Sequence, residues 1–399
     1  EPCMRDVRAA RVAGFGTTIF TEMSALAIQH HAVNLGQGFP DFAGPAFVKQ
    51  AAADAIASDL NQYAPMPGLP RLRKAAAAEW QRQHGREIDW QSEVSVTSGA
   101  TEALCDAMLA LLDPGDGVLF FEPAYDAYVP DITMAGGKPI PVRLHPPTDS
   151  NGAWLFDEHE LRAAFEQRPK LVLLNTPHNP TGKVFTRSEL EQIAELCQEY
   201  DVVAITDEVY DRLVFDGKSH VSLATLPGMW ERTLTLNSIG KTFSVTGWKI
   251  GWSVGPANLN QALRAAHQWV TFATSTPLQE ASAVALEQAV SNGYYRQLLD
   301  EYQQRRGLLI KVLAEAGLPQ LVAEGSYFIS CDISALGLCD TREFCLRLVR
   351  EQGVAAIPIS AFYIDPTSAP PLARFCFAKK LETIAAGGER LRGLRVHER

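Results

Sequence analysis

The feature that most constrains the fold is a series of short apolar runs that alternate with helical patterns through the middle of the chain. The runs are Val94–Thr97, Val118–Phe121, Ile140–Leu144, Leu171–Leu174, Val202–Thr206, Thr233–Leu236 and Ile250–Val254. Helical patterns lie between them, and the one at 186–200 opens with Thr186 and Glu189, a capping box. Strands that alternate with helices predict a mostly parallel sheet buried on both faces.

The C-terminal part of the chain has a different pattern. A long amphipathic helix is predicted at 293–316, and short strand and helix patterns follow it. The 399 residues are enough for a large core and a second, smaller domain. We therefore expect a large domain at 46–290 and a small α+β domain built from 1–45 and 291–399. The first 45 residues read as irregular chain packed against the C-terminal part.

Charge and cysteine content exclude some functional classes. The net charge of -10 argues against nucleic acid as the main partner, although local cations can still hold a phosphate. No apolar run approaches 18 residues, and Glu1–Arg11 lacks the apolar core of a signal peptide. The seven cysteines form no CxxC pair, which argues against a disulfide framework or a metal site. We expect a cytoplasmic protein without a membrane partner.

Polar segments follow four of the predicted strands. They are Ser98–Thr101, Asn175–Gly182, Asp207–Tyr210 and Asn237–Thr242. Taken singly, these residues have ordinary explanations: Lys241 could be a solvated surface residue, Asp207 a helix cap and Asn179–Gly182 a turn. Ligands of open parallel sheets bind at the carboxyl ends of the strands, so four such segments at one edge predict a site.

The segment 238–249, Ser-Ile-Gly-Lys-Thr-Phe-Ser-Val-Thr-Gly-Trp-Lys, resembles the lysine signature of class I/II aminotransferases, which depend on pyridoxal 5'-phosphate (PLP). Asn179–Gly182 and Asp207–Tyr210 precede it in the family's order, and the resemblance runs from Gly16 to Lys379. It is strongest to the kynurenine aminotransferase, glutamine transaminase K and bacterial methionine aminotransferase group. It implies fold type I, with a mostly parallel seven-stranded sheet, helices on both faces and a smaller α+β domain.

The resemblance implies specific roles around the PLP ring. Lys241 matches the lysine that holds PLP as a Schiff base and later moves a proton, for which a primary amine is needed. Asp207 matches the carboxylate that keeps the ring nitrogen protonated. Tyr210 and Asn179 match the side chains that bind the ring's phenolic oxygen. Tyr125 matches the aromatic that stacks on the ring; without the resemblance it would read as a core aromatic.

Other residues match the phosphate site. Gly99, Ala100 and Thr101 open a helix, where backbone N–H groups suit an anion. Ser238 and Lys249 match the side-chain ligands of the phosphate. The wider class usually has arginine at the second of these positions, whereas lysine is typical of the kynurenine and methionine group, and it predicts a single-point contact.

The substrate pocket is implied in the same way. Arg374 matches the clamp for the substrate α-carboxylate, whereas the residues alone leave an internal salt bridge equally open. The pocket positions within one subunit are Phe20, Gly38, Asn179, Phe328 and Arg374. Tyr63 and Phe272 match positions supplied by a second subunit, Tyr63 also reaching the phosphate. We therefore expect a homodimer with composite sites.

The function implied is ping-pong transfer of an amino group from a large uncharged amino acid, such as methionine, kynurenine, phenylalanine or glutamine, to a 2-oxo acid. Phe20 and Ala273 stand where some members carry tryptophan and histidine. The same site could instead act as a cysteine-S-conjugate β-lyase. A ligand-sensing regulatory module would carry an extra DNA-binding domain, and only about 90 residues precede Val94.

Overall fold

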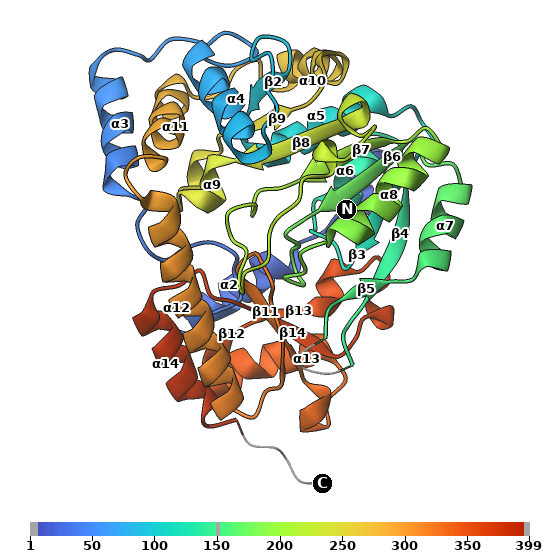
Figure 1. The fold of residues 1–399 in the computed structure, drawn as a ribbon. Helices are drawn as coiled ribbons and strands as arrows, with labels where there is room; N and C mark the ends of the chain where they lie inside the picture. The colour runs from blue at the N-terminus through green and yellow to red at the C-terminus, as the bar shows by residue number, and fades with distance from the viewer. Residues whose placement is uncertain (1–6, 149–151, 395–399) are drawn as a thin grey trace, which may run out of the picture.

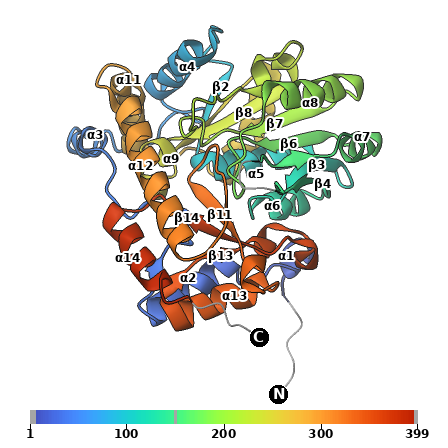
Figure 2. The same cartoon turned by 60° about the horizontal axis from the view of Figure 1, so that its bottom comes forward.

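The computed structural model describes residues 7–148 and 152–394. Its larger part is a sheet covered by helices, and a smaller sheet with its own helices lies below it (Figure 1). The helix α12, Tyr294–Glu315, runs along one side of both parts in Figures 1 and 2.

The large sheet contains eight strands in the described part of the chain. They are β2 Val94–Thr97, β3 Gly117–Glu122, β4 Lys138–His145, β5 Leu155–Phe156, β6 Leu171–Asn175, β7 Val203–Asp207, β8 Thr233–Ser238 and β9 Gly251–Val254. Their order across the sheet is β2-β9-β8-β7-β6-β3-β4-β5. The pairs from β8 to β4 are parallel, whereas β9 and β5 run antiparallel to their neighbours. The fold class is therefore as predicted, and a two-residue edge strand, β5, too short to leave a pattern, raises the strand number from seven to eight.

Helices cover both faces of this sheet, as the unbroken apolar runs predict. On β6, Leu171 and Leu173 pack with the helices α5 Gly99–Leu111, α6 Tyr128–Met134 and α10 Ala257–Val270. Val172 and Leu174 point to the opposite face, toward α7 Glu158–Glu166 and α8 Arg187–Glu199. A third group of helices packs at the β2 and β9 end of the sheet: α3 Ala46–Ala57, α4 Pro70–His84 and α11 Thr276–Ala289.

The lower part is an α+β unit. Its antiparallel sheet has the order β10-β11-β14-β13, with β10 Gln320–Leu321, β11 Phe328–Asp332, β13 Ile357–Pro358 and β14 Leu372–Cys376. The helices α13 Thr341–Arg347 and α14 Leu381–Leu391 accompany it, and a π-helical turn, Leu348–Gln352, follows α13. The helix predicted near 341–352 is therefore present in two pieces.

Most of the N-terminal segment packs with this lower part, although its first helix contacts α6 of the large part, and the segment is not irregular. It forms α1 Ala10–Ala13, α2 Ile19–Gln29 and β1 Val33–Asn34, and β1 pairs with β12 Val354–Ala355. In both views α2, in blue, lies among orange and red C-terminal elements (Figures 1 and 2). The helix forms because the Thr18 side chain accepts the N–H of Thr21, and because Met23 and Ala27 fall on one buried face. The domain boundaries at 45 and 290 stay a prediction.

None of the helices in the described part of the chain combines the length and the apolar character that crossing a membrane requires. The six cysteines within that part are free thiols, and Cys3 lies outside it.

Candidate active site

The carboxyl ends of β2, β6, β7 and β8 meet at one edge of the large sheet, facing the lower part of the molecule. A cavity of about 410 Å³ lies there, a volume typical of small-molecule sites. All but two of the predicted site residues line it: Phe20, Gly38, Gly99, Ala100, Thr101, Tyr125, Asn179, Asp207, Tyr210, Ser238, Lys241, Lys249, Phe328 and Arg374. The two exceptions are Tyr63 and Phe272.

Lys241 lies on α9, Ile239–Thr242, a single turn that directly follows β8. Its Nζ atom is 5.7 Å from the ring centres of both Tyr210 and Tyr327. Burial lowers the pKa of this amine to about 8, although the nearby Asp207 opposes the change. A lysine with such a pKa is partly neutral near pH 8, which an amine needs in order to attack a carbonyl carbon.

Asp207, the last residue of β7, is the acidic group that faces Lys241. Its Oδ2 atom accepts a 2.7 Å hydrogen bond from the Tyr128 hydroxyl. Burial raises the pKa of this carboxyl, and the Tyr128 hydrogen bond acts in the opposite direction. The Asn175 side chain donates to the Asp207 carbonyl at 2.9 Å and fixes the end of the strand. Asp207 is therefore a buried carboxyl group whose position is fixed by hydrogen bonds, and a cationic partner would stabilise its ionised form.

Tyr128 was missed by the sequence analysis. It lies three residues after Tyr125 at the start of α6, and the two rings meet edge to face at 5.6 Å. The available signal was the short spacing of the two tyrosines: the turn before α6, in which the Tyr128 N–H donates to the Tyr125 carbonyl, brings their rings together. Other lining residues without a predicted role include Gln37, Asp126 and Asn175.

The other end of the cavity is built for an anion. The helix α5 begins at Gly99, whose φ of +74° is left-handed, and a Cβ atom there would come within 3.2 Å of the Lys249 side chain. Lys249 donates to the Thr101 hydroxyl at 2.9 Å. The free N–H groups of the helix start, one ammonium and the hydroxyl of Ser238 therefore border the same space.

Arg374 reaches the cavity from β14 of the small sheet. It is 1% exposed, and its guanidinium donates at 2.8 Å to the side-chain oxygen of Asn179 and to the carbonyl oxygen of Gly36. Its Nε atom has no hydrogen-bond partner among the residues described. Burial lowers the pKa of Arg374 to about 10. Because both of these acceptors are uncharged, the internal salt bridge that the sequence left open is not formed within the described residues.

The pocket around Arg374 is aromatic and tight. The guanidinium carbon lies 3.9 Å from the ring centre of Phe328 and 5.5 Å from that of Phe20. Gly38 leaves room for Phe328, because a Cβ at that position would come within 2.8 Å of the phenylalanine ring. The Gly38 carbonyl accepts a 2.5 Å hydrogen bond from Tyr327.

Tyr63 and Phe272 lie outside this cavity, but beside each other. Their ring centres are 5.7 Å apart, and their exposed fractions are 88% and 43%. Two neighbouring exposed aromatic rings are typical of a contact surface.

The chain matches the profile of the family "Aminotransferase class I and II" over residues 30–391. It is 42% identical to methionine aminotransferase of Escherichia coli (strain K12) over 385 residues, which cover 96% of this chain and 98% of the relative. It is 42% identical to kynurenine--oxoglutarate transaminase 1 of Homo sapiens over 418 residues, with 98% and 99% covered. The solved N-succinyldiaminopimelate aminotransferase from Mycobacterium tuberculosis matches with a TM-score of 0.92 and 44% identity, covering 96% of this chain and 99% of that one.

The chain therefore belongs to the aminotransferase class I and II family, with fold type I, and it is a transaminase. The predicted family, fold class and enzyme class are confirmed. Members of this family depend on PLP and act on an amino acid and a 2-oxo acid. The relatives' names differ in the amino acid that they specify, so the substrate has to be argued from the cavity.

Proposed function

We propose that this protein uses PLP to transfer the amino group of a large uncharged L-amino acid to a 2-oxo acid in two ping-pong half-reactions. The observation that carries the proposal is the convergence of Lys241, Asp207 and Arg374 on one cavity, with an anion-binding helix start beside them. Each of these three groups is buried, and burial shifts each pKa toward the uncharged form. Each group therefore carries its charge at a cost in free energy, and a ligand with complementary charges would reduce that cost for all three.

The donor set fits PLP. The phosphate suits the N–H groups of Gly99, Ala100 and Thr101, with Ser238 and Lys249 as side-chain ligands. The ring nitrogen suits Asp207, which Tyr128 already orients, and the ring face suits Tyr125. The phenolic oxygen suits Tyr210 and Asn179. When bound, PLP supplies an electron sink for the bond that breaks at the substrate Cα.

The protein's own groups then have separate tasks. With PLP bound, Asp207 would keep a proton on the ring nitrogen, and Tyr210 and Asn179 would donate to the phenolic oxygen. Lys241 would hold the cofactor through its amine and would take up and release the proton at the substrate Cα. A pKa of about 8 suits this exchange, because the amine can both take and release a proton near neutral pH.

Arg374 binds the substrate α-carboxylate. Its fork of N–H groups matches a carboxylate at two points, and its unpaired Nε indicates that it has donors to spare. Phe20, Phe328 and Tyr125 form an apolar wall for the substrate side chain. Asp126, another residue of the cavity lining, would repel a second substrate carboxylate. These groups favour large uncharged donors such as methionine, kynurenine, phenylalanine or glutamine over aspartate.

Two composite sites in a homodimer explain the position of Tyr63 and Phe272. These rings are exposed and lie outside the cavity of their own subunit. In a dimer of this kind they would complete the cavity of the second subunit, where Tyr63 would donate to the phosphate. The cytoplasmic location stays a prediction.

The test begins with the purified protein. PLP should give a visible absorbance band that borohydride bleaches, and Lys241→Ala should lose both the band and transamination. Lys311→Ala, which removes an exposed lysine of α12, is the matched control and should keep both. If Lys241→Ala transaminates at the wild-type rate, the proposal is wrong.

The substrate is tested with a panel of amino donors against several 2-oxo acids. The panel includes methionine, kynurenine, phenylalanine, glutamine, aspartate and N-succinyldiaminopimelate. The proposal requires a higher kcat/KM for the uncharged donors than for aspartate. Formation of pyruvate and ammonia from a cysteine S-conjugate without any 2-oxo acid would instead indicate β-lyase chemistry.

A further inference from the structure

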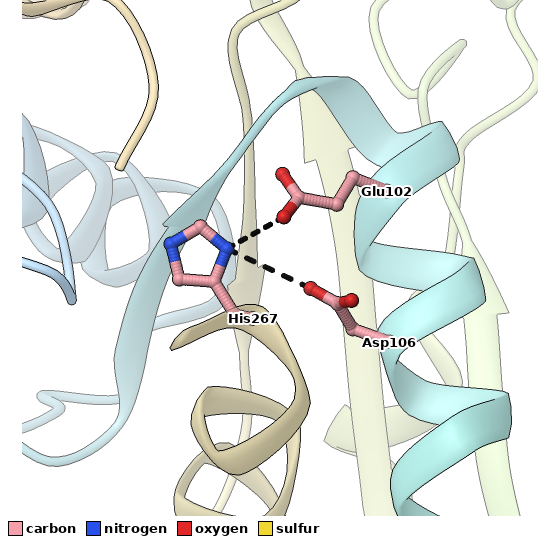
Figure 3. A group of neighbouring side chains, drawn as sticks. All are labelled: Glu102, Asp106 and His267. Atoms are coloured by element: carbon pink, nitrogen blue, oxygen red, sulfur yellow. Dashed lines mark hydrogen bonds and ion pairs between the residues drawn. The ribbon is translucent and has the colours of Figure 1, made fainter. Parts of the chain in front are cut away.

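Three buried ionisable side chains lie behind the start of α5, outside the cavity. Glu102 and Asp106 share one face of α5, and His267 approaches them from α10 (Figure 3). The His267 Nδ1 atom is 2.7 Å from Oε1 of Glu102 and 3.6 Å from Oδ2 of Asp106. All three residues are buried, with exposed fractions of 0% for His267 and Asp106 and 8% for Glu102.

The hydrogen bonds of His267 require protons on both ring nitrogens. Nδ1 faces Glu102, whose lowered pKa favours the ionised carboxylate, which can only accept, and Nε2 lies 3.0 Å from the carbonyl oxygen of Met66. Both partners are acceptors, so the ring is an imidazolium. Burial lowers the pKa of His267, but the Glu102 hydrogen bond and the charges of the two carboxylates outweigh this and raise it to about 9.

Glu102 connects this cluster to the anion site. Its second carboxylate oxygen accepts the backbone N–H of Ser98, the residue before the left-handed Gly99. The carboxylate therefore fixes the turn that starts α5, whose next N–H groups border the cavity. It also places a negative charge in the first helical turn, and Asp106 adds a second charge one turn later.

This arrangement creates an electrostatic conflict that His267 resolves. Two carboxylates on the first turns of a helix compete with a phosphate dianion for the positive end of the same helix. Lys249, which donates to Thr101 on the cavity side, is needed for the phosphate itself. A cation behind the helix is therefore required if Glu102 is to hold the Ser98 turn without repelling the phosphate.

We infer that His267 is a positioning residue for the cofactor phosphate: as an imidazolium it neutralises Glu102 and keeps that carboxylate on the Ser98 amide. The inference rests on the proposed PLP site. A metal ion is a poorer occupant of the cluster, because ligands of a tetrahedral ion with bonds of about 2.0–2.2 Å would stand roughly 3.3–3.6 Å apart. The Nδ1–Oε1 separation of 2.7 Å is that of a hydrogen bond.

The experiment measures the dissociation constants of PLP and of pyridoxal, which lacks the phosphate, for the full-length apoprotein at pH 8. His267→Gln keeps donors at this position but removes the charge. It should raise the Kd of PLP about tenfold or more, with the Kd of pyridoxal changed by less than about twofold. Adding Glu102→Gln to His267→Gln removes the uncompensated carboxylate and should restore the PLP Kd to within about threefold of wild type.

Asp106→Asn is a second, independent test, because it removes one carboxylate charge and keeps the His267–Glu102 pair. It should leave the PLP Kd unchanged or lower, because it removes a negative charge behind the phosphate. The inference is overturned if His267→Gln weakens the binding of PLP and of pyridoxal alike, or the binding of neither. It is also overturned if the double variant binds PLP as weakly as the single one, or if Asp106→Asn weakens PLP binding. A chelator that reproduces the effect of His267→Gln would overturn it as well, because the cluster would then hold a metal ion. A wild-type protein without the borohydride-sensitive band would refute the proposed function instead, so the two failures are distinguishable.

Discussion

Replacing Tyr128 with phenylalanine tests whether the buried acid at the centre of the site depends on its one tyrosine donor. Tyr128 is 2% exposed, and its hydroxyl is 2.7 Å from Oδ2 of Asp207. Phenylalanine keeps the ring and its edge-to-face contact with Tyr125. The substitution therefore removes a hydrogen bond to a carboxylate while leaving the packing almost unchanged.

The magnitude follows from the charge of the acceptor. A hydrogen bond to an ionised group contributes about 1.5–3 kcal/mol, which corresponds to about 10- to 150-fold in an equilibrium or rate constant. Burial raises the pKa of Asp207, and the Tyr128 hydrogen bond opposes this, so the pKa of Asp207 rises further in the variant. A less acidic partner keeps less positive charge on the PLP ring nitrogen, and kcat should fall by about tenfold to a hundredfold.

The pH dependence gives the sign of the effect on the apoprotein. Because the folded-state pKa of Asp207 is raised, keeping this group ionised costs stability above that pKa, and the cost disappears as the pH falls through it. The variant loses the donor that reduces this cost. It should therefore be less stable than wild type by about 1.5–3 kcal/mol at pH 8, and the difference should shrink on acidification.

The assay is urea unfolding of the two apoproteins in steps from pH 8 down to about pH 4, near the ordinary pKa of an aspartate, together with kcat of the PLP-loaded forms. Tyr294→Phe is the matched control, since it removes a 2.7 Å hydroxyl bond to an uncharged acceptor, the Thr242 carbonyl. The control should lose about 1 kcal/mol of stability at every pH. The reasoning is refuted if Tyr128→Phe retains wild-type kcat, or if its stability deficit stays constant over the whole pH series.

Two further predictions concern the cations of the cavity. Arg374→Lys keeps the charge but loses the two-point fork, so kcat/KM for the amino donor should fall about 10- to 100-fold while the Kd of PLP is unchanged; a PLP Kd that rises in parallel would contradict the assigned role. The rate at which apoprotein captures PLP should increase with pH, reach half its maximum near pH 8 and level off above it, because the neutral Lys241 amine is the reactive form and its pKa is about 8. Stopped-flow absorbance measures this rate, and a rate that still climbs above pH 10 would show an unperturbed lysine.

The sequence predicted the positions of the strands in the large sheet because their information is local. Runs such as Leu171–Leu174 are apolar at every position, and the polar segment after each run marks its carboxyl end. Four such ends meet at one edge in any parallel sheet, so the grouping of Lys241, Asp207 and Ser98 follows from the pattern alone. The resemblance to a family then assigned separate roles to these residues.

What the sequence could not supply depends on pairs of residues that are distant in the chain. The bond from Tyr128 to Asp207 spans 79 positions and joins two residues that look ordinary on their own. The His267 contact with Glu102 spans 165 positions. The helix α2 was missed because exposed apolar residues such as Ile28 blur its apolar stripe, and the burial of Met23 and Ala27 depends on C-terminal elements that pack there. Tertiary context, not local preference, decides such features.

The charges of the cavity also predict how strongly its ligand supports the fold. Burial lowers the pKa of Lys241 to about 8 and that of Arg374 to about 10, and it raises the pKa of Asp207. Each shift means that the apoprotein keeps a charge in an unfavourable environment. PLP would offer an opposite charge to Asp207 and a covalent partner to Lys241. The free-energy cost of these buried charges should therefore be smaller in the PLP-bound protein than in the apoprotein.

Binding at a free PLP concentration of about 100 times Kd should stabilise the fold by about 2.7 kcal/mol. Pyridoxal at the same concentration should stabilise it less, because it leaves Lys249 and the start of α5 without an anion. Thermal unfolding of the apoprotein with each compound measures the difference. Equal melting temperatures with PLP and pyridoxal would mean that the helix start contributes nothing to binding, and the phosphate site would then have to lie elsewhere.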